Sequence, residues 1–238
     1  MKRMVGLLAL IFWLWPAGLA ARADTHALTS SIRFYMDQER KTEGELWIAP
    51  GRSWSKSGNR VLISREDLGV MWSIDPGRGS YMEFPLKETE PAAAKAQADM
   101  RKLWLDYYLP EYDWTIRDTG ETKNIGGFPC RRFEAQGEAD FADIKAIYWI
   151  SESPNVPGGR ALRDYVLGQI KEDRQRAGQA KILSGRANAF MVLREETIDN
   201  SIAPTMIQKT ALIKLEEAPA PAGIYDLPAG LKKIEDRG

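Results

Sequence analysis

The chain has a single cysteine and a single histidine, which excludes most common catalytic and metal-binding arrangements. Among its 238 residues, only Cys130 and His26 carry these side chains. One cysteine cannot form an intramolecular disulfide, so the core alone must hold the fold together, even in an oxidising compartment. One histidine and one cysteine cannot supply a zinc set. His26 also lies close to the start expected for the processed chain, a poor place to hold a catalytic base rigidly.

The chain also lacks a phosphate-binding glycine loop and an excess of charge of one sign. Gly126-Gly127 and Gly158-Gly159 have neither the lysine nor the spacing of such loops. Basic and acidic residues number 33 each, which gives no electrostatic footprint for nucleic acid or for an anionic lipid surface. Among the enzyme mechanisms considered, only catalysis by a pair of carboxylates is compatible with this composition. We expect a protein that is not an enzyme and that needs no cofactor.

Only one long hydrophobic run is present, and it lies at the amino terminus. Lys2 and Arg3 precede the apolar residues 5–15, and Ala21-Arg22-Ala23 supplies small residues at the cleavage positions. This order is typical of a secretory signal peptide, here residues 1–23. At ~1.5 Å per residue the run crosses only about half of a ~30 Å hydrocarbon core, which argues against a membrane anchor.

We therefore expect one exported domain over residues 24–238, soluble in the periplasm and without a transmembrane anchor after processing. The residue after the expected cleavage site is Asp24 and not cysteine, so the acylation of a bacterial lipoprotein is not expected. The length suits a single domain with an ample core.

Apolar residues at every second position predict a series of short strands. Such alternation runs through residues 31–86 and is interrupted by turn residues, for example Pro50-Gly51-Arg52 and Asp75-Pro76-Gly77. Regular turns between alternating segments are typical of an antiparallel meander. Further strands are expected at residues 114–117, 127–135, 144–151, 190–198 and 206–216.

Two segments instead show helical spacing. In the first, residues 90–108, Met100, Trp104, Tyr107 and Tyr108 recur at intervals of three and four, which gives one apolar stripe. The second runs over residues 157–177. Strands interrupted by single helices do not make a βαβ alternation. They indicate an α+β fold, with one antiparallel sheet that carries two main helices on a single face.

Several strings resemble a family of exported bacterial domains of unknown function. They are residues 60–65 (RVLISR), 69–76 (GVMWSIDP), 80–83 (SYME), 125–133 (IGGFPCRRF) and the closing segment 221–233. That family is similar in layout to the LolA/LolB-like carriers of the outer-membrane lipoprotein-sorting system. The resemblance implies a curved antiparallel sheet, a half-open barrel, with helices across its concave face above an apolar cavity. A fold alone does not establish a function.

Aromatic residues carry the remaining functional signal. Trp47 and Trp72 alternate with apolar neighbours, and Tyr81 does the same, so these strands have bulky groups on both faces. Such a strand is either covered on both sides or lines a groove. The predicted ligand-binding residues are Trp47, Trp72, Tyr81, Met100, Trp104, Tyr107 and Tyr108. Simple core packing is the alternative.

Two functional hypotheses follow from these patterns. The first is non-catalytic binding of an apolar ligand, a lipid or an acyl chain, between sheet and helices. The second is an interaction module whose exposed sheet face or edge docks an envelope protein. A separate prediction concerns His26: after cleavage the amine, two backbone nitrogens and the imidazole could enclose Cu(II) or Ni(II) in a square plane. Cys130 is either a thiol activated by Arg131 and Arg132 or a small buried apolar residue.

Overall fold

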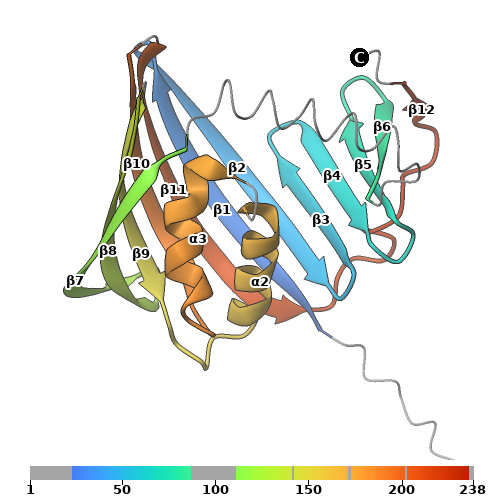
Figure 1. Cartoon of the computed structure of the whole chain (residues 1–238). Coiled ribbons are helices and arrows are strands. Elements are labelled where there is room, and N and C mark those ends of the chain that lie inside the picture. Colours follow the sequence, from blue (N-terminus) through green and yellow to red (C-terminus); the bar gives the residue numbers. More distant parts are fainter. Residues whose placement is uncertain (1–22, 87–110, 141, 171–172, 202, 236–238) are drawn as a thin grey trace, which may run out of the picture.

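One curved antiparallel sheet runs through the whole of the described chain, and two short helices lie against one side of it (Figure 1). The computed structural model describes residues 23–86, 111–140, 142–170, 173–201 and 203–235. The predicted helix at residues 90–108 lies outside these ranges, and so does the expected signal peptide except for its last residue.

Twelve strands build the sheet. They are β1 (Asp24–Tyr35), β2 (Gln38–Ala49), β3 (Arg52–Ser57), β4 (Arg60–Arg65), β5 (Val70–Asp75), β6 (Ser80–Pro85), β7 (Asp113–Ile125), β8 (Phe128–Ala139), β9 (Ala142–Ser151), β10 (Phe190–Asn200), β11 (Ala203–Ala218) and β12 (Lys232–Lys233).

The order of strands shows that the sheet is not closed. It runs β12-β6-β5-β4-β3-β2-β1-β11-β10-β9-β8-β7, so β12 and β7 are the two edges. Neighbours pair antiparallel, except for the short β12, which pairs parallel with β6. β1 is therefore a central strand, paired on one side with β2 and on the other with β11.

Two helices cover one side of the sheet (Figure 1). α2 (Gly159–Ile170) packs Leu162 against β1 and β10, and α3 (Ala177–Ser184) packs Ile182 and Leu183 against β8 and β9. A short 3-10 turn, η1 (Arg174–Arg176), precedes α3. Neither described helix has both the length and the apolar content needed to cross a membrane.

The opposite side of the sheet is covered, over β2 to β6, by the last part of the chain. Val61, Ile63, Trp72 and Ile74 form a cluster against which Leu227 and Leu231 pack. A neighbouring cluster joins Trp47 and Ala49 to Tyr225. We call residues 218–235 the C-terminal segment. It makes a second layer of packing on the face away from the helices.

These observations confirm the predicted fold class, an α+β fold with a curved antiparallel sheet and helices on one face. Of the two described helices only α2 corresponds to a predicted one, whereas α3 was not predicted. Three further details of the prediction were wrong. The first strand begins at Asp24 instead of near residue 31. β3 was not predicted, because Trp54 is its one large apolar residue. The helix expected over residues 157–177 ends at Ile170, since Asp173 adopts an extended conformation and caps η1 instead.

Candidate functional site

The candidate site is the part of the helix side that extends beyond α2 over β3 to β6. Opposed residues on neighbouring strands point to the same face of a sheet. Leu46 packs in the cluster of Leu162 from α2, so it marks the helix side. Leu46 is opposite Ser55, and Ser55 is opposite Leu62. Hydrogen bonding of the Tyr165 hydroxyl of α2 to Ser55 agrees with this assignment.

Four large apolar side chains occupy this part of the helix side. Leu62 on β4 is 37% exposed, and it is followed across the sheet by Met71, Met82 and Phe84, which are partly exposed. None of the four belongs to a hydrophobic cluster formed by the described residues. We call Leu62, Met71, Met82 and Phe84 the apolar row. It offers a surface on which an apolar group can pack.

Three of the predicted ligand-binding residues lie on the other face. Trp47 and Trp72 are 6% and 9% exposed, and they pack with Tyr81 beneath the C-terminal segment. A ligand between sheet and helices would not reach these side chains, and one that bound them would have to displace that segment. Their role in binding stays a prediction, which the packing does not favour.

Hydrogen bonds fix the polar ends of these two tryptophans. The Trp47 Nε1 donates to Glu45 Oε1 at 3.0 Å, and the Trp72 Nε1 donates to Glu83 Oε2 at 2.9 Å. Lys233 donates to the other oxygen of Glu83 at 2.7 Å. The bond from Lys233 and then that from Trp72 hold the pKa of the Glu83 carboxyl below its usual value. Such satisfied indole groups are typical of structural tryptophans.

The remaining predicted ligand-binding residues are Met100, Trp104, Tyr107 and Tyr108. They lie in residues 87–110, outside the described part of the chain, so their place relative to the apolar row stays a prediction.

His26 on β1 is enclosed by side chains of the two neighbouring strands, β2 and β11. Its ring stacks on Trp47 at 4.1 Å between centroids, its Nδ1 lies 3.0 Å from Glu216 Oε1, and its Nε2 lies 3.2 Å from Glu45 Oε1. Hydrogen bonds from Lys214 and from His26 hold the pKa of Glu216 below its usual value.

This position bears on the predicted copper or nickel site. The metal would need the backbone nitrogens of residues 25 and 26, whereas both residues pair with β2 and β11 in the sheet. Within the described ranges, no group of three or more His, Cys, Asp or Glu residues has the geometry to hold a metal ion. The chelate at the terminus stays a prediction, and it would require the start of β1 to leave the sheet.

Cys130 lies on β8 and is 3% exposed. Burial raises the pKa of its thiol to about 11, so the thiolate is scarce at neutral pH. Of the two interpretations of this cysteine, the structure favours the small buried residue over the activated thiol.

A buried ionic cluster lies on the helix side of β9 and β10. Arg194 and Glu196 pair with 3.5 Å between Nε and Oε2, and the Tyr148 hydroxyl donates to Glu196 at 3.2 Å. Burial, above all, lowers the pKa of the Arg194 guanidinium and raises that of the Tyr148 phenol. A buried pair that compensates its own charge is typical of structure, and it presents no free group for catalysis.

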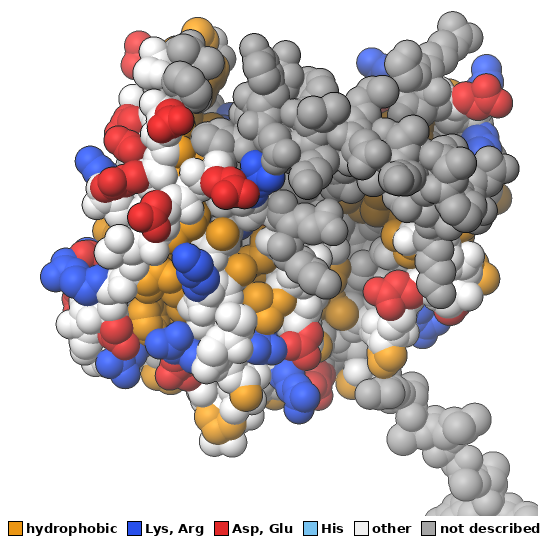
Figure 2. Space-filling view, in the orientation of Figure 1, with side chains coloured by type: hydrophobic (Ala, Val, Ile, Leu, Met, Phe, Trp, Pro, Cys, Tyr) orange, Lys and Arg blue, Asp and Glu red, His pale blue; other side chains and the backbone are white. Residues whose placement is uncertain are grey.

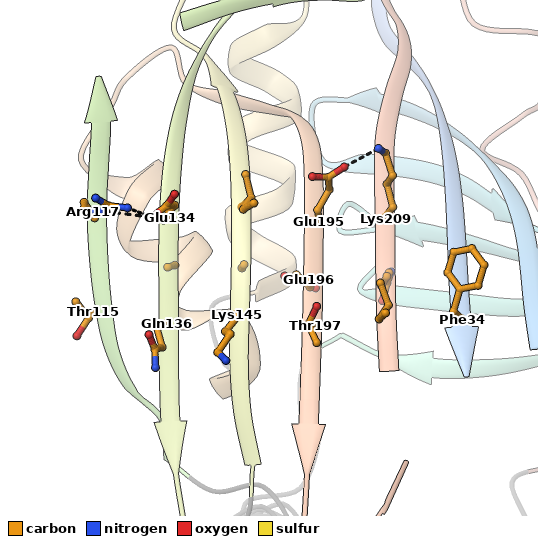
Figure 3. A pocket seen from close by; sticks show the side chains of 15 residues that line it. Phe34, Thr115, Arg117, Glu134, Gln136, Lys145, Glu195, Glu196, Thr197 and Lys209 are labelled. Atoms are coloured by element: carbon orange, nitrogen blue, oxygen red, sulfur yellow. Dashed lines mark hydrogen bonds and ion pairs between the residues drawn. The ribbon is translucent and has the colours of Figure 1, made fainter. Parts of the chain in front are cut away.

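A hollow lies on the face away from the helices (Figure 3). It has a volume of about 750 Å³ and runs across strands β7 to β11 and β1. Phe34 and Ile207, 41% and 47% exposed, supply apolar surface at one end. Two ion pairs also line the hollow, Arg117 with Glu134 and Lys209 with Glu195 at 2.5 Å. Lys145 and neutral polar side chains are further parts of the lining. We call this hollow the outer groove.

The two sides of the molecule thus differ in character. In the visible part of the helix side, hydrophobic side chains gather near the centre, with charged side chains of both signs around and among them (Figure 2). The outer groove instead has two ion pairs across its strands, with Phe34 and Ile207 beside them. Sequence alternation indicated that both faces carry bulky groups, but it did not indicate which face the helices cover.

Comparison with known proteins finds likeness at the level of structure only. No protein-family model matches the chain, and no curated protein matches it. A DUF1329 family protein from Desulfovibrio piger is 10% identical, with a TM-score of 0.34 over 90% of this chain and 93% of that chain. A LolA superfamily protein from Nitrosomonas europaea is 6% identical, with a TM-score of 0.33 over 87% and 91%.

A third solved structure, that of PNGF-II, is 8% identical with a TM-score of 0.35, and it matches 90% of this chain. This chain spans 31% of the length of PNGF-II. The DUF1329 and LolA structures match the resemblance noted in the sequence. With identities and TM-scores this low, the likeness says nothing about a ligand or a site in this chain.

Proposed function

We propose that this protein binds an apolar ligand, a lipid or an acyl chain, on the helix side of its sheet, without catalysing a reaction. The observation that carries the proposal is the apolar row, Leu62, Met71, Met82 and Phe84, which belongs to none of the described core clusters. Trp104, Tyr107 and Tyr108 are expected to complete the site from a helix at residues 90–108. An aromatic stripe with polar tips suits a ligand that has both an apolar body and a polar end.

The proposal includes export to the periplasm. Residues 1–23 have the pattern of a cleaved signal peptide, and β1 begins at Asp24, directly after the expected cleavage site. A chain released there, with no cysteine for acylation, would work as a free periplasmic protein. A start at Asp24 in periplasmic extract would support this part.

Binding is tested by placing one charge on each face of the sheet. Leu62→Asp puts a carboxylate in the apolar row, and Ile207→Asp puts one in the outer groove; the two side chains are 37% and 47% exposed. Because each substitution places aspartate on a strand and removes partly buried apolar area, we expect each to cost about 1–2 kcal/mol of the free energy of unfolding. Leu62→Asp should weaken the binding of a neutral dye such as Nile red by about tenfold or more, because it buries an unpaired charge against the ligand.

Ile207→Asp serves as the matched control and should bind the dye like the wild type. A fluorescence titration gives both affinities, and thermal melts check the folds. The proposal fails when the wild type binds no apolar dye, or when both variants lose binding equally.

A second candidate function is favoured by the outer groove. Exposed apolar residues beside paired charges are typical of protein-interaction surfaces, so this face could dock an envelope protein. Under that function, Ile207→Asp would abolish the capture of the partner and Leu62→Asp would keep it, the reverse of the pattern expected for dye binding.

A further inference from the structure

A polar pocket of about 540 Å³ adjoins the apolar row on the helix side. Its side chains come mainly from the hairpin of β1 and β2, towards the turn, and from the turn between β3 and β4. Arg60 lines this pocket, and Leu62, two residues along β4, belongs to the apolar row. Since residues two apart on a strand share a face, the pocket and the apolar row border each other directly.

Two arginines face each other across the hairpin in this pocket. Arg33 on β1 is directly opposite Arg40 on β2, and the next pair along the same face is Ser31 opposite Thr42. Like charges directly opposite on neighbouring strands destabilise a sheet. An anion bound between the two guanidinium groups would remove this repulsion.

The described neighbours leave this charge largely uncompensated. Asp75 is the one carboxylate that lines the pocket, beside three arginines. That carboxylate is engaged in its own turn, where it accepts from the Arg78 backbone nitrogen at 3.1 Å and pairs with the Arg78 guanidinium at 3.6 Å. Arg33 donates to the neutral amide of Gln208 at 3.4 Å. Within the described residues, Arg40 and Arg60 have no carboxylate partner.

The nearest charges on the next strands do not change this balance. Gln208 on β11 is opposite Glu196 on β10, but that carboxylate is already paired with Arg194 and accepts from Tyr148. Lys41 and Glu43 on β2 alternate with Arg40 and Thr42, so they point to the other face. Counted over the residues that the structure describes, the pocket therefore has a net positive charge.

Gly44 on β2 lies at the floor of the pocket. A Cβ built on this glycine would lie 2.4 Å from Thr29 Oγ1, closer than two such atoms can approach. The Thr29 side chain therefore occupies the space above Gly44, and both residues line the pocket.

We propose that this pocket binds a phosphate group, and that the phosphate is the head of the apolar ligand held on the neighbouring apolar row. The second half of this statement rests on the proposed function. Guanidinium groups match phosphate oxygens in pairs of charge-assisted hydrogen bonds, and the hydroxyls of Ser31 and Thr42 donate to oxygens that the arginines leave free. A ligand of this class is a phospholipid or another phosphorylated amphiphile.

The test compares two soluble lipids that differ only in the phosphate, dioctanoyl phosphatidic acid and dioctanoylglycerol. We expect the wild type to bind phosphatidic acid about tenfold or more tightly than dioctanoylglycerol. The reason is that the phosphate forms at least one charge-assisted pair of hydrogen bonds with an arginine. The double variant Arg33→Gln/Arg40→Gln should bind both lipids with the affinity that the wild type has for dioctanoylglycerol. Isothermal titration gives each affinity.

The matched control, Lys41→Gln/Arg160→Gln, removes two charges at sites that are 71% and 81% exposed. Neither site lines the pocket. This control should keep the preference for phosphatidic acid. Equal binding of the two lipids by the wild type, or equal loss of preference in both double variants, would overturn the phosphate pocket. If the wild type binds neither lipid, the proposed function fails as well.

Glycerol phosphate serves as the third ligand and separates the two sources of phosphate. Binding much weaker than that of phosphatidic acid supports a lipid head, whereas equal affinity assigns the pocket to a small soluble phosphate and overturns the lipid part. The variant Arg33→Gln/Arg40→Gln should stay folded, since both arginines are exposed and their neutralisation relieves repulsion. A loss of binding can therefore be assigned to the pocket. At one ligand concentration, phosphatidic acid should raise the melting temperature of the wild type more than that of Arg33→Gln/Arg40→Gln, which binds it more weakly.

Discussion

The contact between α3 and β7 leaves no room for one further methyl group. A Cβ on Gly178 of α3 would lie 2.4 Å from the Cε3 of Trp114, whose side chain belongs to the buried core. We expect Gly178→Ala to cost about 1–3 kcal/mol of the free energy of unfolding, because the ring and the helix must move apart. Urea unfolding measures the change.

Gly168→Ala on α2 is the control, since a Cβ there meets nothing within 4 Å. It should be neutral or stabilise the protein by up to about 1 kcal/mol, as alanine favours a helix over glycine. Equal effects of the two substitutions would show that α3 does not pack on Trp114 in this way.

At the scale of elements, the C-terminal segment depends on ionised carboxylates. Lys233 pairs with Glu83 at 2.7 Å, and Arg65 pairs with Asp226 at 3.0 Å. A carboxyl whose pKa is lowered in the folded protein stabilises it above the usual pKa. That stabilisation is lost as the pH falls through the folded pKa. The lowered pKa of Glu83 therefore predicts that acid loosens this segment below about pH 4.

The measurement is the midpoint of urea unfolding at pH 6 and at pH 3.5. The midpoint of the wild type should fall more between these pH values than that of Glu83→Gln, which has no charge to lose. Glu39→Gln removes a carboxyl elsewhere on the sheet and should behave like the wild type. A parallel fall in all three would contradict a specific role of Glu83.

The elements also show where sequence reasoning succeeds. Strands with strict alternation, such as residues 60–65 and 70–75, coincide with β4 and β5. The β1–β2 turn gave no signal, because Met36 and Asp37 both adopt positive φ, at 48° and 59°, where glycine or asparagine is usual. The end of α2 was not predicted, because the helical spacing continues past Ile170 while the Asp173 side chain caps η1 instead.

At the scale of the whole molecule, the two faces of the sheet could not be told apart from the sequence. Alternation placed Trp47 and Leu46 on opposite faces, but the assignment of each face depends on which distant segment covers it. Leu46 meets α2, whereas Trp47 meets Tyr225 in the C-terminal segment. Such contacts join residues far apart in the chain, and no local pattern encodes them. The polar pocket was missed for the same reason, since Arg33, Arg40 and Arg60 meet only once the strands pair.

The measurement that tests the central claim most directly is photochemical labelling with a fatty alcohol that carries a diazirine on its chain. The alcohol is bound to the wild-type protein and irradiated, and the labelled sites are mapped by peptide mass spectrometry. The label should attach to the strands of Leu62, Met71 and Phe84 and to residues 100–108. Competition by excess unlabelled alcohol should remove it. Labelling that concentrates instead at Phe34 and Ile207 in the outer groove, or that spreads evenly over the surface, would contradict a ligand site on the helix side.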